Sequence, residues 1–171
     1  MSTYANRGMG FEALINYANE QYLAREIANI QKVSTPWKVV RQGSRIVNAF
    51  PEGKSTVDYM GDYKGRSICF EAKSTEVETR FPLSNFERHQ IDVIRSWRGI
   101  AFALLHFENL QETYLLTKEQ LLHWWDGQFK DGRKSIPLAW IRENARRIGG
   151  PGSSRSVIVL DYLQVVDQVV I

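Results

Sequence analysis

Hydrophobic positions near the start of the chain recur at helical spacing. Apolar side chains such as Phe11, Ile15 and Tyr22 fall on one face when this segment is drawn as a helix. A period near 3.6 residues is typical of an amphipathic helix, so we predict one helix over residues 5–32. The Ser-Thr-Pro sequence at 34–36 ends the pattern, because proline cannot continue a helix.

The following segment has a different character. Residues 37–54 read WKVVRQGSRIVNAFPEGK and mix β-branched residues, cations, glycine and proline. Such a composition favours extended strands joined by a turn. We therefore predict a hairpin-like excursion at about 36–54 that projects from the core like a stalk.

Two strand-like segments come next. Ser55–Tyr59 and Arg66–Lys73 are predicted to be neighbouring strands, and Gly61, Asp62 and Gly65 between them supply residues that tight turns prefer. A hairpin here would place the ends of the two segments side by side.

The second half of the chain alternates between helical and strand patterns. Ser84 and Glu87 have capping-box spacing, which predicts that a helix begins there and runs through Trp97. The nearly unbroken apolar run at 100–106 predicts a buried central strand. The remaining predicted elements are a strand at 112–116, a helix capped by Thr117 and running through Trp125, a helix at 136–147, a short strand at 157–160 and a closing helix at 161–170. This order predicts an α/β fold with layers around one sheet.

Composition bounds the class of protein. A chain of 171 residues with 43% hydrophobic content has the size and core of a single domain. Cys69 is the only cysteine, which excludes an intrachain disulfide and argues against a cysteine-based zinc site. No stretch has the length and apolarity of a membrane span or a signal peptide, so we expect a cytoplasmic protein without a membrane partner. The net charge of +3 is only a mild bias toward anionic partners.

The candidate chemistry lies in the second predicted strand. Alternate side chains share one face of a strand, so Glu71 and Lys73 point one way while Phe70 and Ala72 point the other. A charged pair on an otherwise apolar strand is costly unless something there uses it. The predicted hairpin brings Asp58 beside Glu71.

Two adjacent carboxylates repel each other, and a divalent cation removes that penalty. Mg²⁺ commonly takes one or two carboxylates together with water and substrate phosphate. The bound ion activates water, and Lys73 is placed to orient that water or to stabilise developing charge. Taken alone, the Glu-x-Lys pattern favours an ordinary ion pair on an exposed strand over an active site, because short motifs often match by chance.

Longer sequence blocks favour the active site. They are NRGMGFE at 6–12, STVDYMG at 55–61, FEAK at 70–73, FPLSNF at 81–86 with HQ at 89–90, and LDYL at 160–163. In these blocks and in their order the chain resembles the RecU family of Holliday junction resolvases, which are nucleases of the PD-(D/E)XK superfamily with a restriction-endonuclease-like fold.

The resemblance implies a site as well as a fold. It implies a central mixed sheet flanked by helices, with a projecting stalk. It also implies that Thr56, Asp58, Glu71 and Gln90 hold Mg²⁺, with Mn²⁺ as a substitute, and that Lys73 stabilises the transition state. Glu12, pointed to only by its block, is a candidate outer acidic partner.

The implied activity is Mg²⁺-dependent resolution of four-way DNA junctions during recombination and repair. The expected partners are branched DNA, a second copy of the chain in a homodimer, and a recombinase. The predicted DNA contacts are Arg7 in the first block and four cations of the excursion, Lys38, Arg41, Arg45 and Lys54, since cations on an extended arm suit phosphate contacts. Relative to the family, the N-terminal leader and the stalk are short, which bears on junction preference more than on cleavage.

Two other functions fit the sequence. One is a nuclease of the same superfamily that acts on linear duplex, although a chain this short has no appended target-recognition region. The other is a non-catalytic accessory factor that binds branched DNA. Without the family resemblance, the stalk is equally well explained as a solvated surface hairpin.

Overall fold

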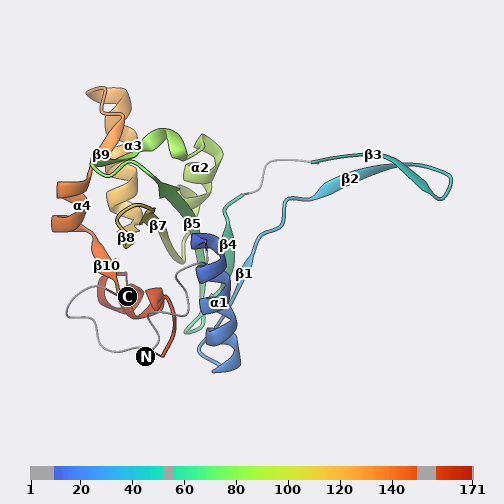
Figure 1. The fold of residues 1–171 in the computed structure, drawn as a ribbon, viewed down its shortest axis with the longest axis horizontal. Coiled ribbons are helices and arrows are strands. Elements are labelled where there is room, and N and C mark those ends of the chain that lie inside the picture. The colour runs from blue at the N-terminus through green and yellow to red at the C-terminus, as the bar shows by residue number, and fades with distance from the viewer. Residues whose placement is uncertain (1–9, 52–55, 150–156, 171) are drawn as a thin grey trace.

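The computed structural model describes residues 10–51, 56–149 and 157–170. Six strands form the main sheet in the order β1-β4-β5-β7-β8-β10, and only the β5–β7 pair is parallel (Figure 1). The expected α/β fold with a central mixed sheet is confirmed. The strands are β1 Ala28–Lys32, β4 Tyr59–Tyr63, β5 Arg66–Thr75, β7 Ile100–Phe107, β8 Glu112–Thr117 and β10 Arg146–Ile148.

Helices cover both faces of this sheet. The helices are α1 Phe11–Ala24, α2 Arg88–Ser96, α3 Lys118–Lys130, α4 Leu138–Asn144 and α5 Tyr162–Val169, with a 3₁₀ turn, η1, at Leu83–Asn85. A small two-stranded sheet pairs β6 Arg80–Pro82 with β9 Ser135–Pro137. No helix among the described residues is long and apolar enough to cross a bilayer.

The sheet divides the buried side chains into two hydrophobic clusters. Phe70 of β5 belongs to the cluster shared with α1 and α5, where its ring stacks on Phe102 at 4.8 Å. Cys69, its neighbour, belongs to the cluster under α2, α3 and α4. This alternation is the expected one for a strand buried on both faces. It places Glu71 on the α2 side of the sheet.

The predicted first helix is partly wrong. Helix α1 ends at Ala24, and Glu26 then takes a positive φ of 56°. Residues 28–32 form β1 instead, which pairs antiparallel with β4 and alternates buried and exposed positions from Ala28 to Ile30. Pairing with a sheet edge buries these side chains better than another helical turn would. Residues 5–9 of the prediction lie outside the described residues.

The predicted turn after Asp58 is also misplaced. The strand begins at Tyr59 rather than at residue 55, and it includes Gly61 and Asp62. The turn is Lys64–Gly65, where both residues have positive φ. Gly61 has another role, since a Cβ there would lie 2.1 Å from the Asn29 carbonyl oxygen of β1.

Predictions for the second half are mostly confirmed. The strands at 100–106 and 112–116, the helix capped by Thr117 and the closing helix are all present. The helix expected at 136–147 is instead β9, α4 and β10, because Pro137 and Ala145 take extended conformations at its two ends. Residues 157–160 form turns and not a strand.

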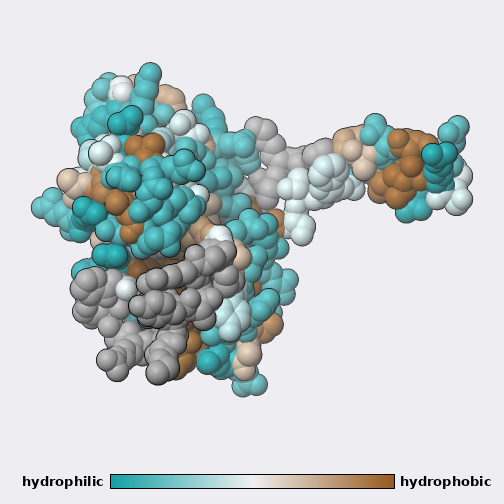
Figure 2. All heavy atoms as spheres, in the orientation of Figure 1, coloured by the Kyte–Doolittle hydropathy of each residue, from teal (hydrophilic) through white to brown (hydrophobic). Residues whose placement is uncertain are grey.

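The predicted excursion is a two-stranded hairpin, here called the stalk. It pairs β2 Trp37–Gln42 with β3 Arg45–Pro51 and projects away from the main sheet (Figure 1). Apolar side chains lie on its surface, including Trp37 at 61% exposure and Ile46 at 52%. Figure 2 shows hydrophobic and hydrophilic side chains side by side on the distal half.

Candidate active site

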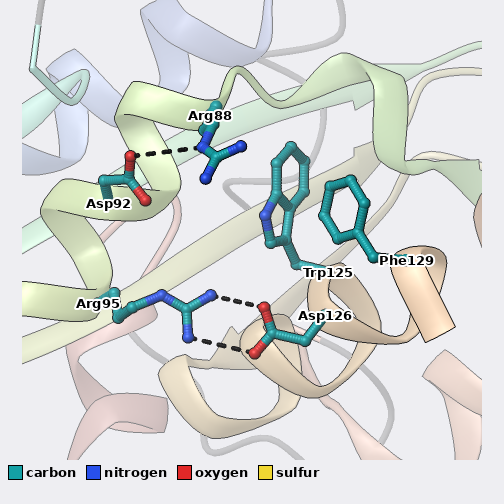
Figure 3. Close-up of a pocket in the computed structure, with 6 residues that line it drawn as sticks. All are labelled: Arg88, Asp92, Arg95, Trp125, Asp126 and Phe129. Carbon is teal, nitrogen blue, oxygen red and sulfur yellow. Dashed lines mark hydrogen bonds and ion pairs between the residues drawn. The ribbon is translucent and has the colours of Figure 1, made fainter.

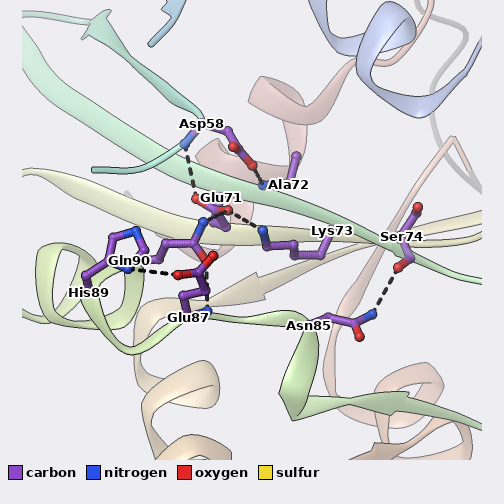
Figure 4. Close-up of polar contacts among 9 residues, drawn as sticks. All are labelled: Asp58, Glu71, Ala72, Lys73, Ser74, Asn85, Glu87, His89 and Gln90. Carbon is purple, nitrogen blue, oxygen red and sulfur yellow. Dashed lines mark hydrogen bonds and ion pairs between the residues drawn. The ribbon is translucent and has the colours of Figure 1, made fainter. Parts of the chain in front are cut away.

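Two carboxylates meet where β4 begins alongside β5. Asp58 immediately precedes β4, and the pairing of Tyr59 with Phe70 sets it next to Glu71. The Asp58 backbone N–H donates to Glu71 Oε2 at 3.1 Å. The Ala72 backbone N–H donates to Asp58 Oδ2 at 3.0 Å (Figure 4). The structure therefore brings together the two acidic residues that the sequence pattern singled out.

Glu71 is the most unusual ionisable group of the site. Its side chain is fully buried, and Oε1 accepts a bond from Gln90 Nε2 and lies 2.7 Å from Lys73 Nζ (Figure 4). The pKa of Glu71 is raised to about 8, chiefly by burial; the contact with Lys73 opposes this rise and the charge of Asp58 adds to it. A second positive charge beside a carboxyl group held this way would stabilise its ionised form.

Gln90 links the start of α2 to Glu71 of β5. Glu87 is the N-cap, and a capping box joins it to Gln90, whose Oε1 accepts the Glu87 backbone N–H at 2.9 Å. The cap expected at Ser84 is wrong, because Ser84 lies in the 3₁₀ turn η1. Glu87 and Gln90 have the same spacing, but glutamate is not among the N-cap residues of the capping-box pattern, so the sequence did not indicate this cap. In the structure the Gln90 amide oxygen accepts the Glu87 backbone N–H. The role of Gln90 as a metal ligand stays a prediction.

Thr56 and Glu12 lie at the edge of the site. Thr56 precedes β4 and is exposed, so the expected strand face shared with Asp58 does not form. Glu12, in the first turn of α1, makes an exposed ion pair of 2.6 Å with Lys32. Burial raises the pKa of Tyr59, and the charges of Glu12 and Asp58 add to that rise.

The donor set is one of hard oxygen ligands. Within the described ranges no group of three or more His, Cys, Asp and Glu side chains gathers to hold a metal. The site instead offers Asp58 and Glu71, with the neutral oxygens of Thr56 and Gln90 as predicted additions. Two carboxylates that leave room for water and phosphate suit a hard divalent cation, whereas structural zinc sites need four nitrogen or sulfur ligands. The buried Glu71 carboxyl is the observation that fits such an ion.

Two further polar residues, Asn85 and His89, lie near the site, and the role of Asn85 was not expected from the sequence. Asn85 Nδ2 donates to the Ser74 carbonyl at 3.0 Å and so ties η1 to the residue after Lys73. His89 Nδ1 lies 3.3 Å from Glu87 Oε2 (Figure 4). Asn85 lies in the FPLSNF block at 81–86, but nothing in that block distinguishes it from a loop asparagine.

The predicted DNA contacts divide into two groups. Lys38, Arg41 and Arg45 are exposed on the stalk. Arg7 and Lys54 lie outside the described residues, so the structure has no bearing on them.

A separate hollow of about 380 Å³ lies between α2 and α3 (Figure 3). Its lining residues are Arg88, Asp92, Arg95, Trp125, Asp126 and Phe129. Arg95 and Asp126 join the two helices by a paired contact of 2.6 and 3.2 Å. Arg88, Asp92 and Arg95 recur at helical spacing on the outer face of α2, whereas Gln90 lies on the buried face. The hollow is therefore distinct from the carboxylate site.

Comparison with known proteins gives the family. The model of the family described as "Recombination protein U" matches residues 6–168. A protein of Lactococcus lactis subsp. cremoris (strain SK11), named Holliday junction resolvase RecU, is 43% identical over 174 residues, covering 96% of this chain and 79% of the relative. A protein of Streptococcus pyogenes serotype M1 with the same name is 40% identical over 174 residues, covering 96% of this chain and 84% of the relative. The resemblance seen in the sequence blocks is confirmed, and the chain belongs to the RecU family.

Proposed function

We propose that this protein is a structure-selective endonuclease that resolves four-way DNA junctions by divalent-cation-dependent hydrolysis of phosphodiester bonds. The observation that carries the proposal is the meeting of Asp58, Glu71 and Lys73 at one point of a RecU-family fold. Relatives that match nearly the whole chain are named Holliday junction resolvases. The process served is homologous recombination and DNA repair.

The chemistry assigned to each residue follows from its place. Asp58 and Glu71 would hold the cation, with Thr56 and Gln90 as further oxygen ligands. When bound, such an ion lowers the pKa of its water and polarises a phosphate. We assign Mg²⁺ because the ligands are oxygens and because phosphate substrates complete its preferred shell, and we expect Mn²⁺ to substitute. Lys73, 2.7 Å from Glu71 and part-exposed, is placed to stabilise charge that develops on the phosphate.

The stalk supplies the contacts expected for branched DNA. Lys38, Arg41 and Arg45 suit phosphates, and phosphate contacts give affinity without reading sequence. Recognition by shape needs no base-reading helix. Exposed apolar side chains such as Trp37 and Ile46 flank these cations along the chain, and the faces of base pairs at the centre of an open junction would offer them apolar surface.

Assembly and location follow from the reaction. Two symmetric nicks in strands of like polarity need two active sites related by a two-fold axis, so we propose a homodimer. We further propose that residues 1–171 form one nuclease domain, that a recombinase is a partner, and that the protein works in the cytoplasm, where bacterial DNA lies.

A junction-cleavage assay tests the proposal. Purified protein is incubated with a mobile four-way junction and Mg²⁺, beside a linear duplex of the same sequence. We expect nicked duplex products from the junction and none from Asp58→Asn. Equal cleavage of both substrates would favour a nuclease of linear duplex. Tight junction binding without cleavage, unchanged by Glu71→Gln, would favour an accessory factor.

A further inference from the structure

The stalk joins the body of the protein beside the catalytic carboxylates. On the incoming side, β1 ends at Lys32 and the stalk strand β2 begins at Trp37. On the outgoing side, β3 ends at Pro51 and the next strand begins at Tyr59. Asp58 is therefore the last residue before the chain re-enters the main sheet.

Asp58 is held at three points through three different atoms. Its carbonyl oxygen accepts the Val33 backbone N–H at 2.8 Å. Its own N–H donates to Glu71 Oε2, and its Oδ2 accepts the Ala72 N–H. Two of these contacts fix Asp58 to the catalytic strand β5, and the third fixes it to the incoming side of the stalk.

The Val33 bond continues the β1–β4 ladder by one residue pair toward the stalk, since Val33 directly follows β1 and precedes β2. The last registered pair of that ladder is Lys32 with Tyr59, so the contact between Val33 and Asp58 is one step further along. The ion pair between Lys32 and Glu12 lies at the same place, but both side chains are about half exposed, and such pairs contribute little. The backbone bond is the stiffer of the two links.

We propose that Val33 is a positioning residue for the cleavage reaction. Its backbone N–H ties the orientation of the stalk to the placement of Asp58 against Glu71, so that a junction gripped by the stalk also sets the cation site. This inference rests on the proposed function. A displacement of about 1 Å at a reacting group can cost about 100-fold in rate, so a small change in the stalk direction is enough to matter.

The direct test removes the Val33 N–H. Val33→Pro deletes the donor, and Ser34→Pro is the matched control, because it places the same ring one residue along and keeps the Val33 N–H. Three quantities are measured for each protein: junction affinity in EDTA, the single-turnover cleavage rate of the saturated complex in Mg²⁺, and binding of Ca²⁺ without DNA. For Val33→Pro we expect junction affinity within about twofold of wild type, a cleavage rate at least about tenfold lower, and weaker Ca²⁺ binding. Ser34→Pro should match wild type in all three.

A second substitution keeps the test decisive if proline prevents folding. Replacing the amide of Val33 with an ester, by incorporating the α-hydroxy analogue of valine, removes the same N–H and keeps the side chain. Wild-type rate and Ca²⁺ binding in the ester protein would overturn the inference, as would an equal loss in Ser34→Pro. A loss of junction affinity alone, with a normal rate once bound, would overturn it too. Failure of the wild-type protein to nick junctions would instead reject the proposed function.

Discussion

The metal-free protein should lose stability as pH rises, because of Glu71. This side chain is fully buried, and burial, aided by the charge of Asp58, raises its pKa from 4.5 to about 8 although Lys73 opposes the shift. In the unfolded chain the carboxyl group returns to its ordinary pKa. Between these two values the folded protein keeps a proton that the unfolded chain has lost.

The sign and size follow from proton linkage. A raised carboxyl pKa contributes stability that is fully present below pH 4.5 and is lost as pH rises through about 8. Each unit of pKa difference between the folded and unfolded states corresponds to about 1.4 kcal/mol. The full difference for Glu71 therefore corresponds to a loss of stability on the order of 5 kcal/mol as an upper limit. That is a large share of the roughly 5–15 kcal/mol by which domains are stable.

The assay is urea unfolding in EDTA from pH 5 to pH 9. Glu71→Gln removes the titrating group at little change in volume, and the part-exposed Lys73 can turn to water. The difference between the free energies of unfolding of the two proteins at each pH cancels the contributions of other titrating groups. One such group is His106, whose pKa is lowered by burial. We expect the variant to be more stable than wild type by several kcal/mol at pH 8.5 and by little at pH 5. In a parallel series with Ca²⁺ in place of EDTA, the stability of wild type should depend less on pH. Glu20→Gln, on the exposed side of α1, is the control. Parallel stability curves for wild type and Glu71→Gln would show that Glu71 does not have a raised pKa in the folded protein.

Three further outcomes are expected. Lys73→Met should lower single-turnover cleavage by about 100-fold or more, with junction affinity kept, because the amine acts on developing charge. A wild-type cleavage rate for Lys73→Met in quench-flow assays would show that Lys73 takes no part in the reaction. Replacing Lys38, Arg41 and Arg45 together by alanine should reduce the slope of log affinity against log salt by about 3, measured by anisotropy on a labelled junction, and an unchanged slope would place the phosphate contacts elsewhere. Gly61→Ala should destabilise the protein by about 1–3 kcal/mol in urea, because its Cβ would meet the β1 backbone, and wild-type stability would show that β1 can move aside.

The sequence predicted the meeting of Asp58, Glu71 and Lys73 better than it predicted the boundaries of the surrounding elements. Alternation on one strand was enough to place Glu71 and Lys73 on one face, and this holds in the structure. It did not reveal how deeply Glu71 is buried, because that depends on α2 packing over β5. Nor did it reveal that Gln90 serves the helix cap and Glu71 at once.

The misplaced boundaries share one physical cause. Residues 28–32 satisfy both a helical and a strand pattern, and the choice is made by pairing with β4, a contact distant in sequence. Gly61 was expected in a turn because glycine favours turns, but here it permits the close approach of β1. In both places tertiary contact outweighs local preference, and a single sequence contains no direct signal of it.

We propose that Asp58 and Glu71 bind one divalent cation between them, and anomalous scattering from Mn²⁺ would locate that ion. Crystals of the protein soaked in Mn²⁺ would be measured for anomalous scattering, with Asp58→Asn crystals treated in the same way. We expect one strong peak in contact with carboxylate oxygens of both residues in wild type, and its loss in the variant. A peak that contacts neither carboxylate, or an unchanged peak in Asp58→Asn, would contradict the proposal.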